Sequence, residues 1–494
     1  MLLYCPKISK HEALKRKFLT NLILLLSINV LVKPFWLFGI DRTVQVVTGD
    51  DYGLYYSLFA LSLTLNMLLD LGITNFNNKN IARYTHLLPK HLGNILGIKL
   101  MLAVFYAIIC LGTGLILGYN GRQFHLLYFL IFNQFFLQLI QYLRSNLSAL
   151  HLFTTDSIAS VLDRVIMIVI CGTLLFTNIT GGVFKIEWFV YVQTISYLLA
   201  AIIIFLIVLK KAGRIKISFN INFSIVFLKK TFPYAILVLL MSLYNRFDNV
   251  LIERMLPHEE GIRQVGLYAH GFRLLDAVSM FGVLFAGMLL PIFSRMIKKR
   301  QEIGEMVTFA FSLIIFLSVT IAFSSFFYQE EIMGWLYKEN ISESAPIFAT
   351  LMFGFIPIST TYIFGTLLTA NGSMRQLNIM AAVGMMLNII LNLILIPKYQ
   401  ALGAAYVSLF TQLITAIAQV IIAIRIFRFK PQWTMAFRVI LFAALVVVLG
   451  MLSMRIGNKL LGYVILLAVS TLTAFAVGLI DLKSLIKLVL NREQ

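Results

Sequence analysis

Long apolar runs limit the fold of this chain more than any other feature. Fourteen segments of about 20 mostly apolar residues follow one another between Phe18 and Ile480, with short polar segments between them. Each run is long enough to cross the hydrocarbon core of a bilayer as one α-helix, which satisfies its own backbone hydrogen bonds there. Hydrophobic side chains make up 60% of the 494 residues. The sequence therefore predicts an all-α polytopic membrane protein with about 14 transmembrane helices.

The spacing of the runs predicts two pseudo-symmetric lobes of six helices each, followed by two additional C-terminal helices. The longest inner loop lies between the sixth and seventh runs and is the natural linker between the lobes. The predicted segments are a cytoplasmic N-terminus at 1–17, an N-lobe at 18–209, a cytoplasmic linker at 210–231, a C-lobe at 232–424, the last two spans at 439–480 and a cytoplasmic tail at 481–494.

Lysine and arginine in the loops predict how the chain is inserted. With a cytoplasmic N-terminus, 28 of the 41 lysine and arginine residues fall in inner segments and nine in outer segments. This bias predicts that both termini are cytoplasmic, because positively charged loops are retained on the inner side. The net charge of +20 then faces an anionic lipid leaflet, so no nucleic-acid partner is needed to explain it.

A short repeat connects the two predicted lobes. Gly-Leu-Tyr occurs at 53–55 and again at 266–268, 213 residues later. The same offset relates Lys33 to Arg246, so each lobe carries one cation 20 residues before its Gly-Leu-Tyr and within an apolar run. A charge in the hydrocarbon core is costly and usually functional. Both cations are predicted to face a hydrated cavity and bind an anionic substrate; the alternative is that their long side chains reach the membrane interface.

Other charged side chains inside the runs are further candidates. Asp248 follows Arg246 by two positions and therefore points to a different face of the helix. Arg273 and Asp276 share one helix face, where they form either an intrahelical ion pair or part of a substrate or proton site. Arg273 is thus an additional candidate for substrate binding. Asp248 and Asp276 are the candidates for coupling to an ion or a proton.

Amide and hydroxyl side chains recur along single helix faces in three of the runs. Such polar faces point away from lipid, either toward a cavity that holds sugar hydroxyls or toward other helices in plain hydrogen bonds. The members predicted to bind substrate are Gln134, Gln138, Asn388 and Gln412, and the same faces also carry Gln141, Asn392, Thr415 and Gln419.

The sequence contains no pattern typical of an enzyme or of a cofactor site. A Walker-type phosphate loop, a zinc-protease motif and a Cys-x-x-Cys pair are all missing, and the three cysteines are far apart. The longest outer loop, 328–348, is too short for a soluble catalytic domain. The sequence therefore predicts a transporter with no catalytic residues, no metal and no cofactor. A membrane polymerase or ligase is disfavoured because those reactions need larger outer loops.

Ten short segments resemble Wzx-type polysaccharide flippases in residue type, order and spacing. They lie at 33–36, 39–42, 52–55, 70–75 and 80–83 in the first half, and at 244–248, 265–268, 273–276, 290–295 and 402–406 in the second. This family belongs to the multidrug/oligosaccharidyl-lipid/polysaccharide (MOP) exporter superfamily. The resemblance implies two six-helix lobes around a central cleft and two additional C-terminal helices.

The resemblance also implies an activity. A flippase of this kind moves a polyprenyl-diphosphate-linked oligosaccharide (an O-antigen, capsule or exopolysaccharide repeat unit) from the inner to the outer leaflet of the bacterial cytoplasmic (inner) membrane by alternating access. Lys33, Arg246 and Arg273 would bind the diphosphate, membrane lipids would surround the chain, and H+ or Na+ would be a counter-ion. The alternatives on the same fold are a lipid II-type flippase and a multidrug or cation antiporter, although a lysine in the first span argues against a cationic cargo.

Overall fold

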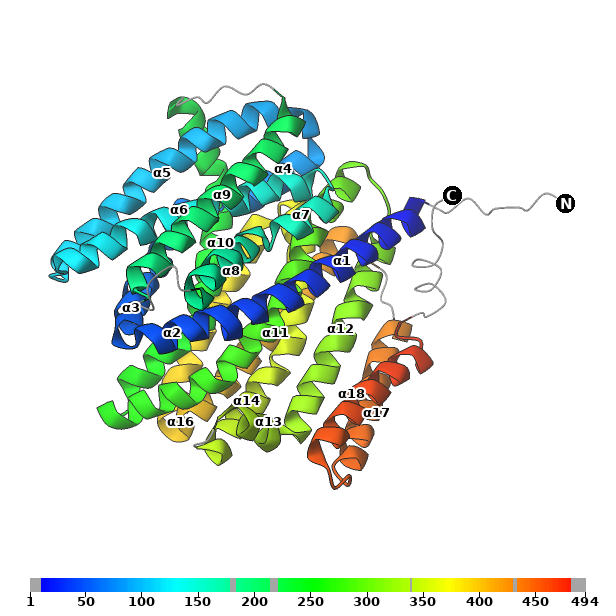
Figure 1. Ribbon diagram of the computed structural model, residues 1–494. Helices are drawn as coiled ribbons and strands as arrows, with labels where there is room; N and C mark the ends of the chain where they lie inside the picture. Colours follow the sequence, from blue (N-terminus) through cyan, green and yellow to red (C-terminus); the bar gives the residue numbers. More distant parts are fainter. Residues whose placement is uncertain (1–9, 178–183, 214–220, 338–339, 430–432, 481–494) are drawn as a thin grey trace. The chain divides into compact units, whose positions relative to one another are not determined.

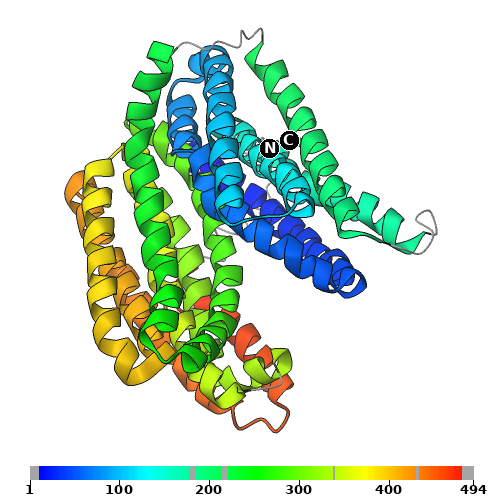
Figure 2. The same cartoon turned by 90° about the vertical axis from the view of Figure 1, so that its left-hand side faces the viewer.

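The computed structural model describes residues 10–177, 184–213, 221–337, 340–429 and 433–480 (Figure 1; Figure 2 shows the same helices after a 90° turn). These residues form α-helices with a few short 3-10 and π-helical turns, and the described ranges contain no strand. Five predicted segments fall partly or wholly outside the described residues: the N-terminus at 1–9, the N-lobe at 178–183, the linker at 214–220, the C-lobe at 338–339, and the tail at 481–494.

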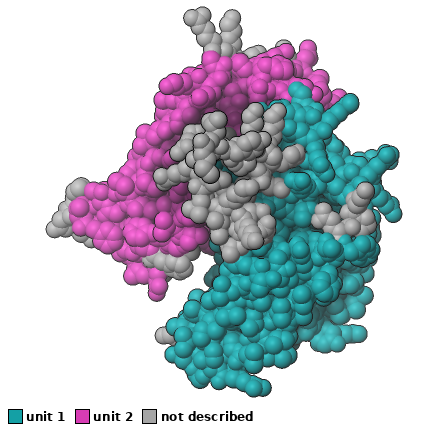
Figure 3. Space-filling view, turned by 90° about the vertical axis from the view of Figure 1, so that its right-hand side faces the viewer, with its two compact units in different colours: residues 1–20, 237–494 teal, residues 21–236 magenta. Residues whose placement is uncertain are grey.

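The chain divides into two compact units, coloured separately in Figure 3. The N-terminal unit comprises Asn21–Ile236, and the C-terminal unit comprises Met1–Thr20 together with Leu237–Gln494. Each unit has a buried apolar core of its own. Two long helices, α1 and α10, contribute residues to both units.

The N-terminal unit is built from α1 to α9, three short turns and the first part of α10. Their bounds are α1 (Lys10–Pro34), η1 (Phe35–Asp41), α2 (Arg42–Thr48), α3 (Asp50–Leu65), η2 (Asn66–Leu69), α4 (Ile73–Arg83), η3 (Thr85–Leu87), α5 (Leu88–Ile116), α6 (Gly121–Ala149), α7 (Phe153–Ala159), α8 (Leu162–Phe176), α9 (Ile186–Ala212) and α10 (Ile221–Met255).

A proline explains where α1 changes its geometry. Pro34 cannot donate a backbone hydrogen bond, and α1 passes at this residue into the π-helical turn η1. Trp36 of this turn is buried and stacks on Phe189 of α9, with ring centroids 6.0 Å apart and an interplanar angle of 5°. The helical path continues through α2, so the first membrane crossing extends over Phe18–Thr48.

Helix α6 lies at the centre of the N-terminal unit (Figure 1). The Asn120 side chain accepts a hydrogen bond from the backbone of Gln123, whose side chain accepts one from the backbone of Asn120, so a capping box fixes the start of α6. From there α6 packs against α3, α4, α5 and α9. These contacts bury many of its polar residues inside the unit, where the candidate site lies.

The C-terminal unit is built from the second part of α10 and from α11 to α18. Their bounds are α11 (His258–Lys298), α12 (Gly304–Phe327), α13 (Gln329–Leu336), α14 (Ile341–Phe353), α15 (Phe355–Asn371), α16 (Met374–Phe427), α17 (Trp433–Ser453) and α18 (Lys459–Ala476). The last two helices pack against each other and against α12 (Figure 1).

Helix α16 is two antiparallel helices joined by a sharp break. A single straight helix of its 54 residues would be roughly 80 Å long, far more than the roughly 30 Å of a bilayer core. The backbone of Gln400 leaves the helical region at φ 52° and ψ −134°. A Cβ at Gly403 would lie 2.4 Å from Leu395 O, and a Cβ at Gly384 would lie 2.8 Å from Thr415 Cγ2. Glycines therefore allow the two halves to pack side by side.

The number of crossings agrees with the sequence. In the described part, 13 helical stretches are long and apolar enough to span a membrane. One of them is α16, which contains two spans, so fourteen crossings result. The prediction of an all-α polytopic membrane protein is confirmed.

Candidate functional site

The Gly-Leu-Tyr repeat corresponds to the same local packing in both units. Tyr55 of α3 stacks on Phe59, with ring centroids 5.8 Å apart and an interplanar angle of 22°. Tyr268 of α11 stacks on Phe272 at 5.7 Å and 21°. Both tyrosines are buried. The offset of 213 residues therefore also relates the two phenylalanines, and it marks a repeated tyrosine–phenylalanine stack.

The polar partner of this tyrosine differs between the units. In the N-terminal unit, Gln193 Nε2 of α9 donates to Tyr55 Oη over 2.8 Å. In the C-terminal unit, Tyr268 Oη donates to Asp248 Oδ2 of α10 over 2.9 Å. A neutral amide thus holds the first tyrosine, whereas an ionisable carboxylate holds the second.

Lys33 lies in the last turn of α1 and is half-buried within the N-terminal unit. The charged groups with the strongest influence on it are Arg144 of α6 and Arg164 of α8, followed by Asp163. Two like charges and one carboxylate therefore lie within electrostatic range of the Lys33 ammonium group. Since like charges repel strongly where water is scarce, an anion bound among the three cations would be stabilised.

Contacts with neighbouring side chains fix both arginines. Arg144 Nε donates to Asp156 Oδ1 of α7 over 2.8 Å. Arg164 Nε lies 3.6 Å from Asp163 Oδ2, and its guanidinium carbon lies 5.4 Å from the ring centroid of Trp36. These interactions hold two planar cations in defined positions within the N-terminal unit.

The sequence does not predict Arg144 and Arg164 as site residues, because the fourth apolar run ends at Leu143. In the structure α6 continues to Ala149, so Arg144 belongs to a membrane-spanning helix, and Arg164 lies in the first turn of α8. One signal for the longer α6 was available, since residues 144–148 contain neither glycine nor proline.

The amides of α6 are mainly engaged within the protein. Asn66 of η2 donates its Nδ2 to Gln134 Oε1 and accepts a hydrogen bond at Oδ1 from Gln138 Nε2. Gln134 is fully buried, Gln138 is half-buried and Gln141 is exposed. Interhelical hydrogen bonding therefore accounts for the position of Gln134. Sugar binding by Gln134 and Gln138 stays a prediction.

A buried polar cluster surrounds Asp248 in the C-terminal unit. Asn392 Nδ2 of α16 donates to Asp248 Oδ1 over 2.8 Å and also to Asn388 Oδ1 over 3.1 Å. Asp248, Asn388 and Asn392 are each fully buried. A carboxylate removed from water is costly unless hydrogen bonds, a proton or a cation compensate its charge. The cluster brings together two residues that the sequence predicts separately, the coupling candidate Asp248 and the substrate-binding candidate Asn388.

Gln412 lies on the second half of α16 and is 4% exposed. Its neighbours Thr411, Thr415 and Gln419 are also buried, so this polar face points into the unit as polar faces in lipid must. A Cβ at Gly365 of α15 would lie 2.7 Å from Gln419 Oε1, which shows that another helix covers this face closely. Contact of Gln412 with substrate stays a prediction.

The remaining predicted residues lie on α10 and α11. Arg246 is part of α10, but its side chain lies outside the part of the chain that the structure describes. Arg273 and Asp276 both lie on the exposed side of α11, three residues apart. Their mutual ion pair, and their roles toward substrate or proton, stay predictions.

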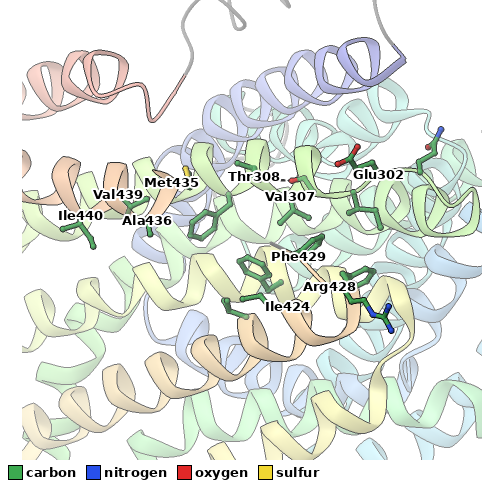
Figure 4. A pocket seen from close by; sticks show the side chains of 17 residues that line it. Glu302, Val307, Thr308, Ile424, Arg428, Phe429, Met435, Ala436, Val439 and Ile440 are labelled. Carbon is green, nitrogen blue, oxygen red and sulfur yellow. Dashed lines mark hydrogen bonds between the residues drawn. The ribbon is translucent and has the colours of Figure 1, made fainter. Parts of the chain in front are cut away.

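A cavity of about 980 Å³ lies in the C-terminal unit among α12, α15, α16 and α17 (Figure 4). Most of its lining is apolar, including Val307, Phe311 and Ile424. Figure 4 shows the charged Glu302 and Arg428 toward one end. Saccharides need several hydrogen-bonding partners, so such walls suit an apolar ligand better than a sugar.

The fold is that of an all-helical multipass membrane protein with a MATE-like architecture. It is similar to an outward-facing multidrug resistance MATE family transporter of the MOP superfamily, with a TM-score of 0.66, 12% identity, and coverage of 85% of this chain and 96% of that chain. The lipid II flippase MurJ in an inward closed conformation gives a TM-score of 0.59, 14% identity, and coverage of 92% and 99%. At these identities the similarity concerns the fold alone.

Residues 18–297 match the polysaccharide biosynthesis protein family, and this match covers more than half of the chain. The chain therefore belongs to that family, which confirms the resemblance to proteins of polysaccharide biosynthesis seen in the sequence. It is 25% identical over 229 residues to the capsular polysaccharide biosynthesis protein CapF of Staphylococcus aureus, covering 44% of this chain and 55% of CapF. The chain spans about half the length of the curated relatives that it matches.

Proposed function

We propose that this protein is a flippase for a polyprenyl-diphosphate-linked oligosaccharide, namely a repeat unit of O-antigen, capsule or exopolysaccharide. It moves the headgroup from the cytoplasmic to the outer leaflet of a bacterial cytoplasmic membrane. Its family provides the link to polysaccharide biosynthesis. Alternating access, in which a central site opens first to one side and then to the other, carries the headgroup across.

The observation that carries this proposal is the like-charge environment of Lys33. A diphosphate cannot cross hydrocarbon uncompensated, because transfer of a bare anion out of water is prohibitive. An ammonium group within electrostatic range of two guanidinium groups is suited to such a ligand. A guanidinium group binds phosphate oxygens through a planar pair of donors, and a lysine adds a compact positive charge.

The membrane potential is the proposed source of energy. Moving one charge across 100 mV changes its energy by about 2.3 kcal/mol, so exporting two net negative charges down an inside-negative potential of 100 mV releases on the order of 5 kcal/mol. This direction requires both termini to be cytoplasmic, as the loop charges predict.

The buried Asp248 is the proposed site of a coupling H+ or Na+. Its oxygens are held by Tyr268 and Asn392, and hydrogen-bonded oxygen ligands suit both a proton and a hard cation. Such an ion would provide a second driving force in addition to the potential.

The alternative of a multidrug antiporter needs an acidic site for a cationic cargo. In the described part of the N-terminal unit, Asp156 and Asp163 each lie beside an arginine. Asp41 accepts a hydrogen bond from Tyr52 over 2.9 Å and lies within electrostatic range of Arg164. Carboxylates neutralised in this way bind a cationic drug poorly, so the anionic cargo is favoured. A lipid II-type cargo has the same diphosphate chemistry and is distinguished by the sugar used in the transport assay.

The proposal is tested by substitutions at Lys33. We expect Lys33→Ala to lower export of a labelled polyprenyl-diphosphate oligosaccharide in proteoliposomes at least tenfold, because the anion site loses its central charge. Lys33→Arg should retain part of the activity. Arg42→Ala removes one exposed cation of α2 as a matched control and should behave like the wild type. Full export by a folded, inserted Lys33→Ala variant would contradict the proposal.

Substitutions at Arg246, in the second half of the chain, test the proposal independently of Lys33. Arg246→Ala should abolish complementation of a flippase-null strain while the protein remains folded and inserted. Arg246→Lys should retain part of the function, because lysine keeps the charge but loses the planar fork. Complementation by Arg246→Ala at the wild-type level would show that Arg246 is not needed to bind the substrate.

A further inference from the structure

The cavity of the C-terminal unit has two chemically different ends (Figure 4). One end carries the charged side chains of Glu302 and Arg428, and both residues are exposed. The opposite end is apolar and includes Val439 and Ile440 of α17. The cavity contains none of the described residues assigned to diphosphate or ion binding. We call this space the α12–α17 cavity, and its lining residues come from 301–311, 364, 420–429 and 435–440.

Helix ends position the two charges at the polar end of the cavity. Helix α16 ends at Phe427, and Arg428 follows with a left-handed backbone conformation at φ 51° and ψ 42°. Glu302 lies just before α12, which begins at Gly304. The loop charges predict that both helix ends are cytoplasmic. A cation and a carboxylate therefore lie together at the predicted level of the inner lipid headgroups.

The apolar part of the cavity belongs to the core of the unit. Phe311 of α12 and Met435 and Val439 of α17 line the cavity and also pack against the buried cluster that joins α12, α17 and α18. A water molecule occupies about 30 Å³, so a cavity of about 980 Å³ far exceeds the space that a few waters fill. Apolar walls hold water poorly, because buried water needs several polar partners. In a bilayer the surrounding solvent is hydrocarbon, so an acyl chain suits these walls.

We infer that the α12–α17 cavity binds a phospholipid with a zwitterionic headgroup, phosphatidylethanolamine. The lipid phosphate accepts hydrogen bonds from the Arg428 guanidinium group, and the primary ammonium group donates to the Glu302 carboxylate. An acyl chain of the lipid occupies the apolar part of the cavity. A purely anionic lipid leaves the Glu302 carboxylate beside a like charge, which is unfavourable. This inference does not depend on the proposed cargo.

The test compares headgroups on the full-length protein. Native mass spectrometry in detergent measures binding of added dioleoyl phosphatidylethanolamine, phosphatidylcholine and phosphatidylglycerol. Equal acyl chains leave the headgroup as the only variable. We expect phosphatidylethanolamine to bind at least fivefold more tightly than phosphatidylglycerol. It should also bind more tightly than phosphatidylcholine, whose quaternary ammonium group has no N–H to donate.

Substitutions of the two charges should have different effects. Arg428→Gln should weaken binding of phosphatidylethanolamine and phosphatidylglycerol at least fivefold, because both lipids carry the phosphate. Glu302→Gln should weaken only phosphatidylethanolamine, so its preference over phosphatidylglycerol should disappear. As matched controls, Arg425→Gln and Glu330→Gln remove charges of the same signs from exposed side chains outside the cavity lining. Both controls should bind the lipids like the wild type.

A variant of Ala436 tests whether an acyl chain enters the cavity. Ala436 lines the cavity and is exposed, so Ala436→Trp places an indole group in the space that the chain needs. We expect binding of all three lipids to fall at least threefold. Phe437→Trp, at an exposed neighbour that does not line the cavity, is the control and should bind like the wild type.

Three results would overturn the inference. The first is equal binding of the three lipids by the wild type. The second is unchanged phosphatidylethanolamine binding in Arg428→Gln, Glu302→Gln or Ala436→Trp. The third is tighter binding of undecaprenyl phosphate than of phosphatidylethanolamine, with the same loss in Ala436→Trp, because the cavity would then hold the lipid tail of the proposed cargo.

Discussion

The pair Lys99–Asp70 shows how this protein compensates a charge inside its fold. Lys99 of α5 is 2% exposed, and its Nζ lies 2.8 Å from Asp70 Oδ1 and 3.1 Å from Leu69 O. Asp70 in turn accepts a hydrogen bond from the backbone N–H of Thr74 in the first turn of α4. Lys99 therefore connects α5 to the turn that precedes α4.

Removing one partner of this pair should destabilise the protein strongly. We expect Lys99→Met to lower the free energy of unfolding by about 3–5 kcal/mol, because Asp70 would keep a largely buried charge without its counter-ion. The double variant Lys99→Met with Asp70→Asn should recover part of the loss. Denaturant unfolding in detergent micelles measures both variants, and Lys90→Met on the exposed face of the same helix is the control. An unchanged midpoint of denaturant unfolding for Lys99→Met would show that the Lys99–Asp70 pair does not stabilise the protein.

At the level of elements, the break in α16 depends on a contact that only glycine permits. A Cβ at Gly403 would lie 2.4 Å from Leu395 O. This oxygen belongs to the backbone, so no change of side-chain rotamer can relieve the contact. We expect Gly403→Ala to destabilise the protein by about 1–3 kcal/mol through overpacking. Gly112→Ala, near the C-terminal end of α5, meets no atom within 4 Å and should be neutral or stabilising by up to about 1 kcal/mol. Thermal unfolding in detergent should separate the two variants, and equal midpoints would contradict this explanation of the break.

Most elements of the fold could be predicted because each apolar run carries its own signal. Even the two halves of α16 appear as separate runs, since the polar residues Lys398 and Gln400 interrupt them. The short helix α4 and the π-helical turn after Pro34 could not be predicted. Neither has a long apolar run, and both depend on packing against distant helices.

The candidate site was only partly predictable for a related reason. Lys33 can be recognised from the repeat, because its position relative to Gly-Leu-Tyr is a property of the sequence alone. Its electrostatic neighbours Arg144 and Arg164 lie more than 100 residues away along the chain, and their proximity follows only from helix packing. The meeting of Asp248 with Asn392 has the same cause, since α10 and α16 are far apart in sequence.

For the whole molecule, the proposed energetics make transport sensitive to the membrane potential. Export of two net negative charges should accelerate when the inside is made more negative, because the potential contributes on the order of 5 kcal/mol per 100 mV. Proteoliposomes with a potassium diffusion potential measure this dependence directly. Asp248→Asn should remove the response to a proton or sodium gradient and leave the response to the potential. Export that is unchanged by the potential would contradict this account of the driving force.

The duplicated tyrosine–phenylalanine stack has one consequence for how each half of the protein responds to protons and cations. Gln193, which holds Tyr55, is neutral at every physiological pH. Asp248, which holds the equivalent Tyr268, can be either ionised or protonated. At this position the two copies therefore differ in one chemical respect, because only the later copy holds its tyrosine with a group that can gain or lose a proton. Placing an acid at position 193 would give the earlier copy the same property, and the two halves would then compete for the same ions.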